Sequence, residues 1–127
     1  MSMIVALAFL KVLLYLTAVA LAVAAVHEVG HATAAVFCGH RIVGVRISWT
    51  GLSVRHEHPN PSLVNRMIIT ASGPGLGLLS ALVCYLGGQS QIVPMFMAFE
   101  AVNLFWPTPA TDGYRLLQAF REWRKGR

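Results

Sequence analysis

The chain contains three long apolar stretches, at residues 3–37, 63–86 and about 91–106. The first two are each long enough for a helix that crosses the roughly 30 Å hydrocarbon core of a bilayer. The third is shorter, and we expect it to cross with little tilt or to end where Pro107 breaks the helix. Backbone groups in lipid must be hydrogen-bonded within their own segment, so each stretch is predicted to be a transmembrane α-helix.

A different pattern occupies residues 41–58, between the first two stretches. Apolar side chains stand two residues apart on both sides of Thr50 and Gly51, at Val43, Val45, Ile47, Trp49, Leu52 and Val54. A period of two is typical of strands, and Thr50 with Gly51 offers a turn, so we predict a short interfacial β-hairpin. Three histidines here are expected to lie in a solvated interface rather than at a second metal site: His40, His56 and His58.

The last predicted element is a helix at residues 112–124. Apolar residues recur there with helical spacing, and arginines occupy positions between them, so this helix is expected to be amphipathic and to suit the inner leaflet. The elements together predict an α-helical integral membrane protein. It has three transmembrane helices, a short interfacial β-hairpin and a C-terminal amphipathic helix.

Composition supports a membrane setting. Hydrophobic residues make up 56% of the 127 residues and charged residues only 12%, which is too apolar for a soluble domain of this size. We interpret residues 1–127 as a single membrane domain. We also expect the first stretch to remain as a span and not to be cleaved as a signal peptide, because only Met1 and Ser2 precede it and Lys11 lies within it.

The ten Lys and Arg residues are unevenly distributed. Nine of them flank the first connection or follow the third stretch, whereas residues 87–90 contain none. Lys11, near the outer end of the first stretch, is the exception. By the positive-inside rule, this pattern predicts an outside N-terminus and a cytoplasmic C-terminus, in a multi-pass protein of the cell membrane. The net charge of +5 is therefore interpreted as topology and contact with anionic lipid, and not as nucleic-acid binding.

The segment His27-Glu28-Val29-Gly30-His31 places two imidazoles and a carboxyl group inside the first apolar stretch. Residues four apart share a face of a helix, so His27 and His31 can bind one cation. Zinc suits this set best, and it lowers the pKa of a water molecule to about 7. Glu28 then serves as general base and acid in amide hydrolysis. An idle carboxyl group at this depth would cost about 2.5 to 3.5 kcal/mol on insertion scales, which favours metal chemistry over chance.

Two acids compete for the role of third metal ligand. The first and third stretches both end at the cytoplasmic side, so Asp112 is expected to share a depth with His27 and His31. Asp112 can supply a hard oxygen ligand, or it can cap the final helix. Glu100 lies within the third stretch and is expected to be deeper than the histidines, so we favour Asp112.

A glycine-rich segment of the second stretch falls at the same depth, at residues 72–77. Gly73, Gly75 and Gly77 permit close helix approach or leave an opening beside the metal. Pro74 frees a backbone carbonyl group nearby. Both plain helix packing and a contribution to the site are consistent with this pattern.

Three segments together resemble the motifs of the site-2 protease family of intramembrane zinc metalloproteases. These segments are His27 to His31, the G-x-x-x-G form from Gly73 to Gly77, and the Pro-rich stretch from Asn103 to Gly113. The resemblance covers nearly the whole chain as a minimal catalytic core. It implies a three-helix core with one zinc ion per chain, held by His27, His31 and Asp112, and Glu28 as general base and acid.

The resemblance also implies contacts with substrate. It suggests Asn103, Gly73 and Gly77 as substrate-binding residues, and it implies that the hairpin holds an unwound substrate segment by strand addition. A purely structural hairpin is the alternative. The stretch from Asn103 to Asp112 is one residue longer than is common in the family, and Gly77 stands where the family often has Asn.

Two classes of function remain open. The first is a zinc-dependent intramembrane endopeptidase, which uses a zinc-activated water to hydrolyse peptide bonds in or near transmembrane segments of membrane proteins. The second is a noncatalytic homologue that binds membrane helices. Glu28 favours the first, because a binding protein needs no general base. The partners then expected are a transmembrane protein substrate and the lipid bilayer.

Overall fold

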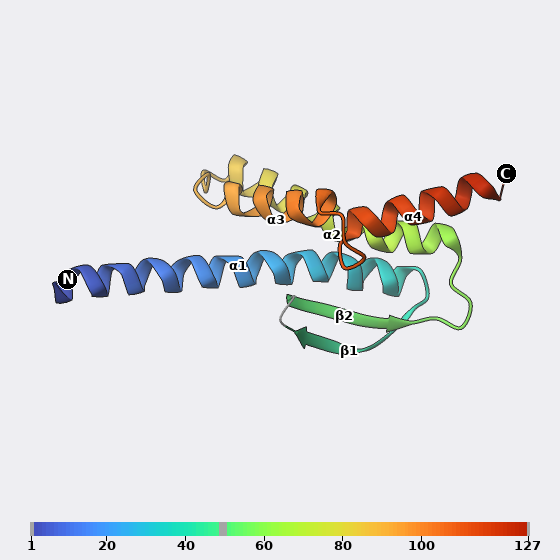
Figure 1. The fold of residues 1–127 in the computed structure, drawn as a ribbon, viewed down its shortest axis with the longest axis horizontal. Coiled ribbons are helices and arrows are strands. Elements are labelled where there is room, and N and C mark those ends of the chain that lie inside the picture. Colours follow the sequence, from blue (N-terminus) through green and yellow to red (C-terminus); the bar gives the residue numbers. More distant parts are fainter. Residues whose placement is uncertain (1, 49–50, 127) are drawn as a thin grey trace.

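The fold is mostly helical, with one small sheet (Figure 1). The computed structural model describes residues 2–48 and 51–126. Its elements are, in order, α1 (Met3–Phe37), β1 (Arg41–Ser48), β2 (Gly51–Glu57), α2 (Leu63–Leu86), α3 (Val93–Phe105) and α4 (Asp112–Lys125). This order confirms the predicted helical protein with a short hairpin and a C-terminal helix. Trp49 and Thr50, predicted at the tip of the hairpin, lie outside the described residues.

Among the described residues, α1 and α2 are the helices long and apolar enough to cross a bilayer. α1 has 35 residues; the hydroxyl group of Ser2 accepts the N–H of Val5 at its start, and Gly39, with a φ of 80°, follows its end. α2 has 24 residues, and the hydroxyl group of Ser62 accepts the N–H of Asn65 at 3.0 Å. Both helices have the bounds predicted from the apolar stretches.

The N-terminal part of α1 extends beyond the rest of the fold (Figure 1). At 35 residues the helix is about 52 Å long, which exceeds the roughly 30 Å of a hydrocarbon core. The most apolar 18 residues of α1 include no buried residue, and many of the exposed side chains of the helix are large and apolar. A surface of this kind suits contact with lipid, since it has no neighbouring helix to cover it.

α3 is shorter than the third predicted span. It has 13 residues, where about 16 were predicted, and is about 20 Å long. Pro94 lies in its first turn, where the missing N–H costs no hydrogen bond. Trp106, which ends it, is extended because Pro107 follows. Two candidate spans are therefore shown, and the third span remains a prediction.

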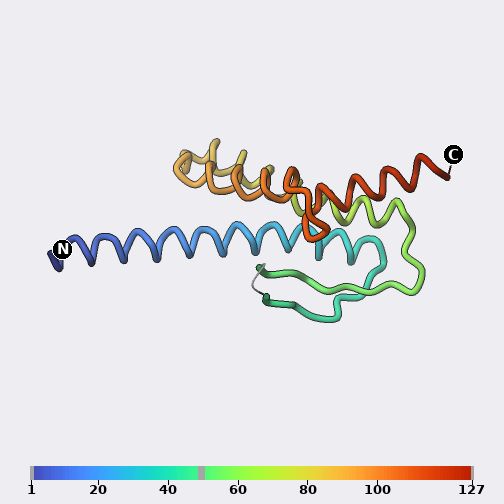
Figure 2. The backbone as a smooth tube through the Cα atoms, in the orientation of Figure 1, coloured from blue at the N-terminus to red at the C-terminus, as the bar shows by residue number. Residues whose placement is uncertain are grey.

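The helices pack around a small apolar core between α1, α2 and α3. Its buried members are Val23, Ala81 and Phe96. α2 and α3 form an antiparallel pair that lies along the middle of α1, and α4 packs against α2 (Figure 2). An exposed ion pair of 3.1 Å joins Arg66 of α2 to Glu122 of α4. This packing brings the first residue of α4 to the second half of α1.

β1 and β2 form an antiparallel hairpin, which runs back along the second half of α1 (Figure 1). β2 lies between β1 and α1. The register pairs Val45 with Val54, and a bulge between Ile42 and Gly44 shifts it. The outer edge of β2 therefore faces the helix that carries His27 and His31.

Candidate metal centre

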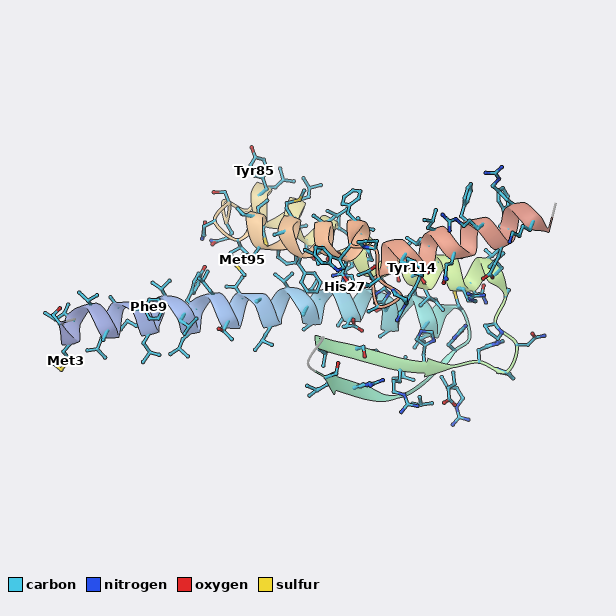
Figure 3. All side chains as sticks on the ribbon, viewed as in Figure 1. Met3, Phe9, His27, Tyr85, Met95 and Tyr114 are labelled. Atoms are coloured by element: carbon cyan, nitrogen blue, oxygen red, sulfur yellow. The ribbon has the colours of Figure 1, made fainter. Side chains whose placement is uncertain are left out.

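His27 and His31 stand one helical turn apart in α1, beside the junction of α3 and α4, where Figure 3 labels His27. Their Nε2 atoms are 3.0 Å apart, and His27 is only 3% exposed. Nδ1 of His31 donates to the carbonyl oxygen of Ile69 in α2 at 2.7 Å. Because a carbonyl oxygen only accepts, this bond puts the ring hydrogen on Nδ1 and leaves the lone pair of Nε2 for a metal.

Glycines make the crossing of α1 and α2 close enough for this arrangement. A Cβ atom on Gly30 of α1 would overlap the backbone carbonyl group of Ser72 in α2. A Cβ atom on Gly73 would overlap the imidazole rings of His31 and His27. Gly73 therefore makes the space that the two rings occupy. The glycines that allow α1 and α2 to approach closely thus also form the site.

Asp112, the first residue of α4, brings a carboxylate to both rings. Its Oδ2 lies 2.9 Å from Nε2 of His27 and 3.1 Å from Nε2 of His31, and the residue is 4% exposed. The hydroxyl group of the preceding residue, Thr111, donates to the carbonyl oxygen of Trp106 at 2.7 Å. This bond folds the connection between α3 and α4 back on the end of α3. The N-cap residue Thr111 makes no side-chain cap bond to α4. Its hydroxyl group bonds to the loop instead, and the carboxylate of Asp112 contacts the histidines.

The electrostatics of the site favour the charged form of Asp112. Burial acts to raise its pKa, but when the two imidazoles are protonated, their hydrogen bonds and positive charges outweigh burial and lower the pKa of Asp112 to about 2. Asp112 is therefore a carboxylate at neutral pH. That is the form in which an acid binds a cation.

Glu28 faces strand β2. Its Oε2 accepts a hydrogen bond of 2.8 Å from the backbone N–H of Val54. Its carboxyl oxygen also lies within 4.8 Å of the imidazole nitrogens of His27 and His31. Glu28 is thus close enough to act on a molecule at the histidines, and a strand backbone holds it in place.

Glu100 of α3 contacts the other side of the His27 ring. Both of its carboxyl oxygens lie 3.0 Å from Nδ1 of His27, and the residue is 1% exposed. The expectation that Glu100 lies deeper than the histidines was wrong, because His27 is one turn deeper than His31 and meets α3 at this level. The signal available in the sequence was the cost of burying a carboxyl group without a partner.

A cavity of about 1080 Å³ lies between β2 and the site. Its lining includes Glu28, His31, Asp112, Asn103 and residues of β2 from Gly51 to Val54. The side-chain amide of Asn103 donates to the carbonyl oxygen of Phe99 in its own helix at 3.2 Å. Asn103 therefore lines the cavity but is not bonded to the residues that meet at His27.

The three histidines near the hairpin lie together. Nδ1 of His40 is 2.9 Å from Nδ1 of His56, and the rings of His40 and His58 stack at 4.8 Å. His40 is buried rather than solvated as expected, because the rings of His56 and His58 lie against it. Within residues 2–48 and 51–126, the candidate metal group found is at His27, Glu28 and His31, and not at these three histidines.

The chain also matches a model of a protein family. The match is to Peptidase M50B-like and covers residues 1–108. The chain belongs to the Peptidase M50B-like family. This is a site-2 protease family domain, so the resemblance carried by the three motifs is confirmed. No curated protein matches the chain.

The Peptidase M50B-like match includes His27, Glu28 and His31 but ends before Asp112. Site-2 proteases are membrane-embedded and generally depend on zinc. The case for Asp112 therefore rests on the geometry of the fold.

That geometry fits zinc. Nε2 of His27, Nε2 of His31 and Oδ2 of Asp112 form a triangle with sides of 2.9, 3.0 and 3.1 Å. In a tetrahedral zinc site with bonds of about 2.0 to 2.1 Å, ligand atoms are roughly 3.3 Å apart. Two imidazoles and a carboxylate also form the ligand set of hydrolytic zinc sites that keep a fourth position open. The structure brings together the three residues predicted as ligands, and their binding of zinc remains a prediction.

Proposed function

We propose that this chain is a zinc-dependent intramembrane endopeptidase, which hydrolyses peptide bonds in or near transmembrane segments of membrane proteins. The observation that carries the proposal is the convergence of His27, His31 and Asp112 beside Glu28 in an apolar helical fold. Membership of the Peptidase M50B-like family supports it, since that family suggests an intramembrane metalloprotease.

One zinc ion per chain is proposed, with His27, His31 and Asp112 as its ligands. Bound there, zinc supplies a Lewis acid that polarises the scissile carbonyl group and makes water more acidic. Glu28 is not proposed as a ligand. Oδ2 of Asp112 touches both Nε2 atoms, whereas Oε2 of Glu28 is bonded to the N–H of Val54.

Glu28 is the proposed general base and acid. It takes a proton from water as the water oxygen attacks the carbonyl carbon. It returns that proton to the amine nitrogen when the C–N bond breaks. The hydrogen bond from Val54 orients the carboxylate for both transfers, because it fixes one oxygen and leaves the other free.

The substrate in this proposal is a transmembrane segment that has unwound locally, because a helix hides its peptide bonds in its own hydrogen bonds. The cavity of about 1080 Å³ beside β2 is large enough for an extended stretch of several residues. The outer edge of β2 would pair with that stretch by strand addition. Asn103 lines the cavity and is proposed to contact substrate. The resemblance also suggested Gly73 and Gly77 as substrate-binding residues; they lie against the two imidazole rings and Glu100, so we propose that they make room for these side chains.

The proposed protein is multi-pass, in the cell membrane, with an outside N-terminus and a cytoplasmic C-terminus. α1 and α2 are the first two spans. α3 is the third, and because it is short, we propose that it crosses together with the loop at residues 106–111. The arginines of the hairpin and α4 then lie near anionic lipid headgroups.

The proposal is tested by comparing membrane proteins in cells that carry the wild-type chain or Glu28→Gln. An endopeptidase predicts substrate fragments in the wild type and accumulation of the uncut protein in the variant. Identical fragment patterns in the two strains would contradict the proposal. They would favour a noncatalytic homologue that binds membrane helices.

A further inference from the structure

Glu100 takes no part in the chemistry described above, although it is among the most deeply buried side chains of the fold. We propose that Glu100 is a positioning residue for the metal ligand His27, and that Gly77 is the residue that admits it. The inference rests on the proposed zinc site. It adds to that site an acid on α3 and a glycine on α2.

The two ring nitrogens of His27 have different partners. Both carboxyl oxygens of Glu100 lie 3.0 Å from Nδ1, and Oδ2 of Asp112 lies 2.9 Å from Nε2. With the ring hydrogen on Nδ1, His27 donates to Glu100 and keeps the lone pair of Nε2 for the metal. Glu100 therefore acts on the side of the ring away from the ion, so it is not a rival of Asp112 as a ligand.

His31 has the same arrangement with a different acceptor. Its Nδ1 donates to the backbone carbonyl oxygen of Ile69 at 2.7 Å. Acceptors of this kind on metal-binding imidazoles fix the tautomer and the orientation of the ring. A carboxyl acceptor also makes the imidazole a stronger ligand. The acceptor for Nδ1 of His27 thus comes from α3, and the acceptor for Nδ1 of His31 comes from α2.

A second residue of α3 holds the same ring. Phe99 meets His27 edge to face, with ring centroids 5.2 Å apart. Glu100 and Phe99 contact the imidazole together, so rotation of His27 away from the site would break both contacts. A buried carboxyl group in an apolar helix is costly without a hydrogen-bond partner, and Nδ1 of His27 is the partner found for Glu100.

Gly77 explains how the Glu100 side chain fits between the helices. A Cβ atom at Gly77 would overlap Oε1, Cδ and Cγ of Glu100. A Cβ atom at Gly75, on the same helix, would meet nothing within 4 Å. Both glycines lie within α2, so an alanine has a similar effect on the backbone at either position. Only the alanine at position 77 places a methyl group against Glu100.

Zinc affinity tests the role without any need for proteolysis. Purified Glu28→Gln protein is the parent, and a competing chelator measures its dissociation constant for zinc. Glu100→Ala is expected to bind zinc about 10- to 100-fold more weakly, as for loss of other groups that support metal ligands. Glu100→Gln keeps an oxygen that accepts from Nδ1 and should lose less. Glu122→Gln, an exposed acid on α4, is the control and should bind as the parent does.

A double-mutant cycle tests the part played by Gly77. Gly77→Ala should weaken zinc binding in the parent but add little to Glu100→Ala, because the group it displaces is then absent. Gly75→Ala should change neither. Fully additive losses for Gly77→Ala and Glu100→Ala would overturn the proposed pairing.

The absorption spectrum of bound cobalt gives a readout of the ligand geometry. It should change in Glu100→Ala and return toward that of the parent in Glu100→Gln. An unchanged spectrum with zinc affinity within twofold of the parent in Glu100→Ala would overturn the role of Glu100 and leave the zinc site standing. A parent that binds no zinc would overturn the proposed function, and this role with it.

Discussion

The backbone N–H of Val54 donates a hydrogen bond of 2.8 Å to the side chain of Glu28. Because this N–H bonds to a residue of α1, it points away from β1, although Val54 is paired with Val45 of β1. The hairpin is therefore part of the candidate site, because its outer edge holds the acid that is proposed to move protons. The same edge is where an extended substrate would add to the sheet.

Removal of this N–H should slow catalysis without loss of the metal. Val54→Pro lacks the donor, and a proline is tolerated on the outer edge of a strand. A hydrogen bond to a charged group contributes about 1.5 to 3 kcal/mol, so kcat should fall about 10- to 100-fold. Val54→Ala keeps the N–H and is the control. Equal kcat values for these two variants in a reporter cleavage assay would refute a role for the bond.

Gly73→Ala should disrupt the metal site, because its methyl group would occupy the space of the His31 and His27 rings. We expect zinc affinity to fall by about 10-fold or more, since displaced ligands lose the geometry that a tetrahedral site requires. Gly75→Ala is the matched control, with nothing within 4 Å of its added methyl group. Metal analysis of the two purified variants decides the matter, and equal zinc content in both would show that Gly73 does not shape the site.

Asp112→Ala should remove the third ligand. Two imidazoles remain, and we expect zinc affinity to fall at least about 100-fold and activity to be lost. The lowered pKa of Asp112 keeps its carboxylate charged in mild acid, so loss of zinc on acidification should reflect protonation of the imidazoles. Full zinc retention in Asp112→Ala, measured beside Glu28→Gln, would remove Asp112 from the site.

The topology predicts which ends of the spans can be labelled from outside. Single cysteines at Gln89 and Lys125 are placed in a chain whose native Cys38 and Cys84 are changed to serine. In intact cells, an impermeant thiol reagent should label position 89, while position 125 should react only after the membrane is opened. The reverse pattern would contradict the proposed orientation.

The bounds of the two long helices agree with those predicted from the apolar stretches. A bilayer requires long apolar runs, and Ser2 and Ser62 stand where a helix start needs a hydroxyl group. The ends of α3 were less predictable, since Pro94 and Pro107 limit the helix from both sides more than hydropathy does. The third span is still a prediction because α3, with 13 residues, is shorter than a helix that crosses a bilayer alone.

The site was predictable only in part. The spacing of His27 and His31 and the Pro-rich break before Asp112 led to the expectation that the three would meet, and the fold brings them together. The contacts made by Glu100 and by Glu28 were not foreseen. They join residues 73 and 26 positions apart, through helix and strand packing that no local periodicity encodes.

The central claim is that zinc held in this site hydrolyses peptide bonds with the help of Glu28. The most direct measurement is cleavage of a transmembrane reporter by the purified protein in liposomes, before and after removal of metal by a chelator. We predict cleavage that is lost on chelation and restored by zinc in the wild type, and Glu28→Gln protein that binds zinc as tightly but does not cleave. Cleavage that survives complete removal of metal, or that is unchanged in Glu28→Gln, would contradict the account.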